Sequence, residues 1–154
     1  MRKIKFKAKQ LNSGKWFEGD LVHLGNRVCI GGDNIKDGIT DVDPETVCQF
    51  TGFLDKNGRE IYEGDILRSD EYPFSCMEDG VRDNYFGMIE GSNEEALFLL
   101  TCVKNPKSAV RGISDGISDE ITQQKLEDCE LVGCIYDPEW QAEILKINDK
   151  VSGF

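Results

Sequence analysis

The sequence predicts a mainly β fold, α+β at most: a small, twisted, antiparallel β-barrel-like domain with one or two short helices near the C-terminus. Three observations support this prediction. Apolar and polar residues alternate strictly at the N-terminus, short aliphatic segments recur along the chain, and turn sequences such as Asn57-Gly58 separate them. Helical patterns are confined to two short segments near the C-terminus.

The first thirty residues are typical of a three-stranded antiparallel meander. Residues 3–9 alternate lysines with apolar residues, which is the period of a half-buried strand. A turn at 12–15 precedes a second strand at 16–24, and Gly25-Asn26 precedes a third at 27–30. The lysine face is either exposed or protects an edge strand from pairing with another chain.

The rest of the chain is interpreted in the same way. Strands are predicted at 45–54, 64–68, 85–90, 95–103 and 129–137, with a hairpin turn at 91–93. Residues 31–44 and 69–84 resemble loops, and 104–118 a flexible loop. One short helix is predicted over 119–128 with Ser118 as its N-cap, and another over 138–147 with Pro138 at its first position.

Charge is distributed unevenly along the 154 residues, whose net charge is −11. Five of the 18 basic residues lie within residues 1–9, so the remaining chain has 13 basic against 29 acidic residues and carries −16. This balance disfavours direct nucleic-acid binding, which needs a basic surface. It suits a solvated surface, a basic protein partner, or a mimic of nucleic acid.

The chain shows no sign of export or of membrane insertion. No apolar core of a signal peptide follows the charged N-terminus, and no apolar run approaches the length of a membrane span. We therefore expect a cytoplasmic protein. Its six cysteines form no C-x-x-C pair, so we expect reduced, buried thiols rather than a zinc site.

One phrase occurs twice, as WFEGDLV from Trp16 and as IYEGDIL from Ile61. The carboxylates of each phrase could share one strand face and bind a cation. The alternative is structural, with two equivalent strand starts in which Gly takes an unusual dihedral angle and Asp caps local amides. The structural interpretation is favoured. The candidate functional or structural residues are Trp16, Glu18, Gly19, Asp20, Asn57, Gly58, Tyr62, Glu63, Gly64 and Asp65.

No other pattern indicates catalysis. His23 is the sole histidine, so any Ser-His or Cys-His nucleophile depends on it. The sequence contains no phosphate-binding or dinucleotide-binding glycine loop, and the segment from Asp55 does not match a calcium loop. We therefore expect no cofactor, no metal and no catalytic residue.

Residues 50–67, FTGFLDKNGREIYEGDIL, resemble the signature segment of the YopX-like proteins of phages and prophages. The opening segment and the closing ELVGCIYDPEW are also similar to that family, with Cys134 where Asn is frequent, whereas 69–128 match poorly. The matching signature residues are Thr51, Gly52, Asp55, Lys56, Asn57, Gly58, Ile61, Tyr62, Glu63, Gly64 and Asp65.

The resemblance implies a phage or mobile-element origin, a mainly β fold and no established activity. It suggests a single YopX-like domain over 1–147, with the meander at 1–30, the signature at 45–68, a flexible insert at about 104–118, and a tail at 148–154. The predicted function is that of a non-enzymatic accessory protein in the host cytoplasm. Its partner is an unknown host or phage protein, or further copies of itself.

Two alternatives remain open. One is a metal-dependent enzyme that uses Glu18, Asp20, Glu63 and Asp65, which stabilisation by divalent metals would support. The other is an acidic mimic of DNA, which requires carboxylates ordered along an elongated surface. Displacement of duplex DNA from a host DNA-binding protein would support it.

Overall fold

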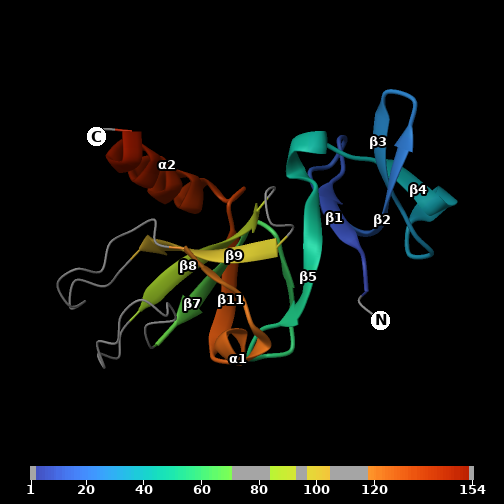
Figure 1. The fold of residues 1–154 in the computed structure, drawn as a ribbon. Helices are drawn as coiled ribbons and strands as arrows, with labels where there is room; N and C mark the ends of the chain where they lie inside the picture. The colour runs from blue at the N-terminus through green and yellow to red at the C-terminus, as the bar shows by residue number, and fades with distance from the viewer. Residues whose placement is uncertain (1–2, 71–83, 93–96, 105–117, 153–154) are drawn as a thin grey trace. The chain divides into compact units, whose positions relative to one another are not determined.

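The computed structural model describes residues 3–70, 84–92, 97–104 and 118–152. It divides into two compact units, Met1–Gly52 and Phe53–Phe154, which we describe one at a time. The predicted mainly β class is confirmed, because both units are built on antiparallel strands (Figure 1). The described strands form two open sheets, so the barrel is not closed.

The first unit contains the predicted meander. The order of its strands in the sheet is β4-β3-β2-β1-β5. β1 lies between β2 and β5, so its lysines do not protect a sheet edge. The elements are β1 (Phe6–Lys9), β2 (Trp16–Leu24), β3 (Arg27–Gly31), η1 (Lys36–Gly38), β4 (Ile39–Asp41), η2 (Pro44–Thr46) and β5 (Cys48–Leu54).

The predicted loop at 31–44 is wrong at β4. This three-residue strand pairs with β3, with Ile30 opposite Thr40. Three residues are too few to show the alternation of apolar and polar side chains that marks a strand in the sequence. β4 is extended because it pairs with β3, a long-range contact that the local sequence does not reveal. The core beneath the sheet is formed by one face of the strands and the neighbouring loops, namely Ala8, Ile30, Ile35 and Val42, with Phe6, Phe17, Leu21, Val28 and Val47 against them.

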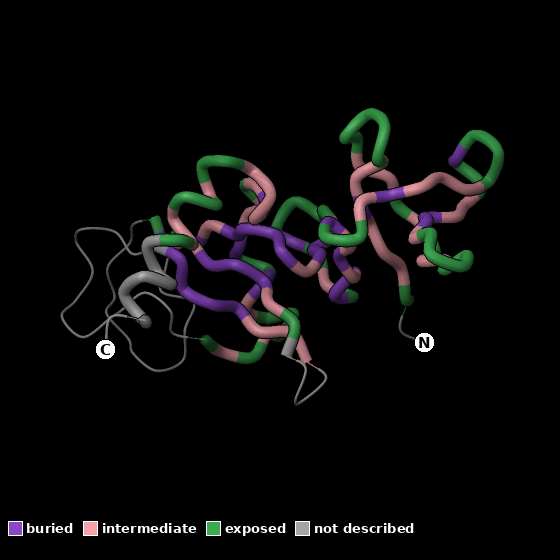
Figure 2. The backbone as a smooth tube through the Cα atoms, turned by 90° about the horizontal axis from the view of Figure 1, so that it is seen from above, coloured by how far each residue is buried: buried purple, intermediate pink, exposed green. Residues whose placement is uncertain are grey.

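The second unit has a five-stranded antiparallel sheet in the order β10-β9-β8-β7-β11. Buried residues follow its strands, whereas exposed residues gather at turns (Figure 2). Its elements are β6 (Glu60–Tyr62), β7 (Asp65–Ser69), β8 (Tyr85–Ser92), β9 (Leu97–Lys104), β10 (Ser118–Glu120), α1 (Gln123–Leu126), β11 (Cys129–Cys134) and α2 (Pro138–Ser152).

The predicted helix over 119–128 is mostly wrong. Only Gln123–Leu126 is helical, with Thr122 rather than Ser118 as its N-cap. Ser118–Glu120 instead forms β10 and pairs with β9, with Asp119 opposite Leu100. Pairing along the open edge of β9 prevails over weak helix propensity in this segment.

The second predicted helix is confirmed and longer than expected. α2 begins at Pro138, whose missing N–H costs nothing at a helix start, and it continues to Ser152. It therefore includes much of the segment 148–154 that we predicted as a tail. Within the described residues, no helix has the length and apolar character needed to cross a bilayer. Most of the predicted insert at 104–118, and the hairpin turn at 93, lie outside the described residues.

Candidate functional site

The turn Asp55–Arg59 of the signature segment is organised by one buried carboxylate. The Asp55 side chain is fully buried, and its Oδ1 accepts the backbone N–H groups of Asn57 at 2.9 Å and Arg59 at 2.8 Å. Gly58 has φ +77°, which glycine adopts without steric cost, and its N–H donates to the Asp55 carbonyl. The turn predicted from Asn57-Gly58 is confirmed, and the aspartate before it folds the backbone around itself.

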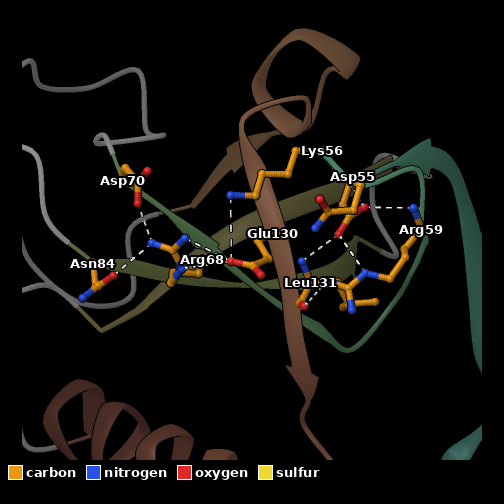
Figure 3. Close-up of polar contacts among 9 residues, drawn as sticks. Asp55, Lys56, Arg59, Arg68, Asp70, Asn84, Glu130 and Leu131 are labelled. Atoms are coloured by element: carbon orange, nitrogen blue, oxygen red, sulfur yellow. Dashed lines mark hydrogen bonds and ion pairs between the residues drawn. The ribbon is translucent and has the colours of Figure 1, made fainter.

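The same turn occupies the outer edge of β11 (Figure 3). Leu131 donates its N–H to Asp55 Oδ2 at 2.9 Å, and its carbonyl accepts from the Arg59 guanidinium at 2.8 Å. Two residues before Leu131 on β11, the carbonyl of Cys129 accepts the backbone N–H of Lys56. Because β11 is the last strand of its sheet, these contacts satisfy backbone groups that would otherwise be exposed for pairing.

Opposing influences act on the pKa of Asp55. Burial raises it, whereas the N–H donors of Leu131, Arg59 and Asn57 and the charge of Arg59 lower it. The donors prevail, so the pKa lies below its ordinary value and the group is a carboxylate at neutral pH.

The second Glu-Gly-Asp phrase forms the turn between β6 and β7. Gly64 has φ +85°, donates its N–H to Ile89 at 2.7 Å and accepts from Ile135 at 2.8 Å. The buried Asp65 accepts the N–H of Tyr62 at 2.8 Å through Oδ2. The predicted roles of glycine and aspartate at a strand start are confirmed for this copy.

The first copy behaves differently, so the predicted equivalence of the two phrases is wrong. Glu18, Gly19 and Asp20 lie inside the continuous strand β2. Gly19 is needed there because a Cβ at this position would collide with the backbone carbonyl of Gly31. Both flanking carboxylates are exposed. The glycine of this phrase therefore allows two strands to approach closely in the first unit, whereas in the second unit it allows a tight turn.

A second polar network surrounds Arg68 on β7 (Figure 3). Its guanidinium contacts Glu130 of β11 at 3.0 Å and also binds Asp70 and Asn84. Lys56 of the signature turn reaches the same Glu130 carboxylate at 3.9 Å. Glu130 therefore links β7 to the turn that covers the edge of β11.

The described residues contain no group of three or more His, Cys, Asp or Glu side chains placed to hold a metal ion. Tyr62 is buried in the core, and Asn57 exposes its side chain at the turn. His23 lies exposed on β2 opposite Val28. Of the ten candidates, Tyr62, Glu63, Gly64 and Asp65 thus share one turn, and Asn57 and Gly58 share the other.

A cationic and aromatic surface lies in the first unit, on β1 and β2. Lys7 Nζ lies 5.0 Å, and Lys9 Nζ 5.4 Å, from the ring centroid of Trp16, which is half-buried. Lys5 stacks on Phe50 at 5.4 Å and lies 3.7 Å from the Glu18 carboxylate. Contacts of this kind hold long lysine side chains over aromatic rings and fix their charges in place.

Five cysteines are free and buried, as predicted, and Cys76 lies outside the described residues. Burial and the neighbouring Asp128 raise the pKa of the Cys129 thiol to about 11. Burial also raises the pKa of Cys29, whose thiol donates to Asp41. Both groups are protonated thiols at neutral pH, which makes them poor nucleophiles.

A family model, YopX protein, matches residues 5–139. The chain belongs to the YopX family. The recognised resemblance is thereby confirmed, and the signature turn and the closing segment that carry it contact each other along β11. No curated protein matches. A solved structure, protein EF1440 from Enterococcus faecalis, is similar at 18% identity and a TM-score of 0.47, over 90% of this chain and 97% of that one.

The central residues of this YopX site were not among the candidates chosen from sequence. The repeated Glu-Gly-Asp phrase supplied most of the candidates, which do not include Asp55, Arg59 or Glu130. An aspartate two residues before Asn-Gly is a recognisable turn-forming signal, so Asp55 could have been selected on that ground. Nothing in the sequence indicates that its second oxygen binds Leu131, 76 residues later.

Proposed function

We propose that this YopX protein is a phage- or prophage-derived accessory protein that acts in the host cytoplasm by binding another protein or copies of itself, without catalysis. The observation that carries the proposal is the surface of Lys7, Lys9 and Trp16 on β1 and β2. Tryptophan is enriched among the residues that dominate protein–protein binding energy. Here it is half-exposed and carries two cations in an otherwise acidic chain.

The use of the signature carboxylates also supports a binding role. Asp55 and Asp65 are buried and direct their oxygens to backbone N–H groups of their own unit. A carboxylate occupied in this way maintains the fold and is poorly placed to transfer protons with a substrate. The signature segment is then a scaffold, and recognition falls to exposed side chains elsewhere on the chain. The proposed origin rests on the resemblance of residues 50–67 to the YopX-like proteins of phages and prophages.

The test is capture of partners by the full chain from lysate of a bacterial host, in parallel with light scattering. Wild-type protein should retain a specific partner or self-associate, and a Trp16→Ala variant should lose much of that binding. The matched control is Leu11→Ala, which removes an exposed apolar side chain outside this surface. Monomeric protein without a partner, together with turnover in a broad hydrolase screen, would refute the proposal.

A further inference from the structure

The outward face of β1 and β2 carries two rows of opposite charge. Lys7 pairs with Glu18 across the two strands, and Lys9 pairs with Trp16. Residues paired in this way share a face of the sheet, and residues two apart on a strand share it too. Asp20 therefore lies on the same face as Glu18, opposite the core residues of β2. Lysines follow β1, and carboxylates follow β2.

The two carboxylates of this face are exposed to solvent, whereas Lys7, Lys9 and Trp16 are half-buried. The Glu18 side chain is 56% exposed, and Asp20 is exposed. The two lysine ammonium groups lie near one indole ring, which places them within about 10 Å of each other. Toward β5 the same face is not accessible to solvent, because Cys48 and Phe50 of β5 are buried. The accessible surface is thus a short strip with a cationic side, an acidic side and Trp16 at one end.

Such a strip is complementary to itself. A two-fold axis that lies in the plane of the strip, parallel to the strands and between the two rows, turns a second copy to face the first. It brings the lysine row of one copy over the carboxylate row of the other, and each contact then occurs twice. A nucleic acid fits less well, because its phosphates would meet Glu18 and Asp20 beside the lysines. A generic acidic protein would meet the same repulsion.

We propose that the chain forms a symmetric dimer through this strip. Following the register of β1 and β2, Lys7 of one copy faces Glu18 of the other, and Lys9 faces Trp16. This inference rests on the proposed binding function and names its partner as a second copy. Each copy carries −11, so long-range repulsion opposes association. At about 0.15 M salt that repulsion is screened beyond about 8 Å, whereas charges in contact still attract. A small, charged interface under these conditions gives a dimer in the micromolar range.

The experiment uses complementary charge reversals in the full chain, measured by sedimentation velocity at about 1–200 μM protein. One double variant is Lys7→Glu/Lys9→Glu, and the other is Glu18→Lys/Asp20→Lys. Each alone places like charges opposite each other and should raise the dimer Kd at least about tenfold. An equimolar mixture should recover a dimer, because both sets of contacts again join opposite charges.

Two controls keep the result specific. Lys15→Glu/Lys36→Glu alters net charge as much as the first variant but at exposed positions outside the strip, and it should dimerise nearly as wild type. Far-UV circular dichroism and thermal unfolding verify that each variant is folded. A monomeric wild type overturns the inference, as does self-association of either variant alone or a mixture that stays monomeric. The lysate capture experiment remains informative in each case, so failure of the dimer is distinguishable from failure of the binding function.

Discussion

Replacing Asp55 with asparagine keeps the shape of the side chain and removes one of its two acceptor oxygens. If the remaining oxygen stays at the position of Oδ1, the N–H bonds of Asn57 and Arg59 persist. The new NH₂ group then faces the N–H of Leu131, 2.9 Å from the former oxygen, and the Arg59 guanidinium. The NH₂ group of the asparagine and the backbone N–H of Leu131 are both donors, so they cannot bond. The partly buried Leu131 N–H therefore loses its partner.

The cost follows from these contacts. Loss of a hydrogen bond to a charged acceptor, together with an N–H left unsatisfied, lowers the free energy of unfolding by about 2–4 kcal/mol. The ion pair with Arg59 adds little, because half of that arginine side chain is exposed. The measurement is urea unfolding at pH 7 followed by circular dichroism. Asp128→Asn, at an exposed aspartate of the same unit, is the matched control and should change stability by less than about 0.5 kcal/mol.

The pH dependence provides a second readout. The pKa of Asp55 is lower in the folded chain than its ordinary value of 3.8, so the folded state binds fewer protons than the unfolded state near that pH. The stability that Asp55 contributes is therefore complete above the ordinary value and is lost as pH falls through the folded-state pKa. The difference between wild type and Asp55→Asn should shrink over the same range. A variant as stable as the control at pH 7, or a difference independent of acid pH, would refute the reasoning.

Further perturbations address the glycine turn, the thiols and the metal alternative. Gly64→Val should destabilise the fold by about 1–3 kcal/mol because φ is +85°, whereas Gly32→Ala, where a Cβ meets only ordinary contacts, should cost less; equal effects would contradict this geometry. In a Cys76→Ser background, thiol titration at about pH 8 should find few reactive groups until denaturant is added, because the pKa of Cys129 is about 11; rapid native labelling of all five remaining thiols would argue against burial. Magnesium, manganese and calcium should leave Tm within about 1 °C, and metal stabilisation lost in Glu63→Gln would favour the enzyme alternative.

Local chemistry made much of the fold predictable from sequence. Strict alternation before Lys9, the turn composition at 12–15 and the strong Asn57-Gly58 signal act over a few residues, and the corresponding strands and turns are present. The same applies to Pro138, whose fixed φ favours a helix start. These features depend on backbone preferences that neighbouring residues already determine.

The errors arose where distant parts of the chain decide the structure. Gly19 and Gly64 stand in nearly the same local sequence, but Gly19 is required by the approach of Gly31, and Gly64 by a turn. Ser118 precedes a helix-like pattern, yet an open edge of β9 recruits it into β10. The sequence did not identify Asp55 as a central residue for a related reason. Its long-range partner is the backbone N–H of Leu131, and a backbone group leaves no mark in the sequence.

The turn Asp55–Arg59, which covers the outer edge of β11, has a consequence for how the chain folds during synthesis. Asp55 emerges from the ribosome early, but Leu131 follows 76 residues later, when most of the chain has been made. Until then β7 lacks the neighbour that β11 provides, and the signature turn has no strand to cover. Vectorial synthesis therefore leaves an unpaired strand edge exposed for several seconds at ordinary elongation rates of about 5–20 residues per second. Chains that end before Cys129 accordingly leave the edge of β7 open for pairing with another chain.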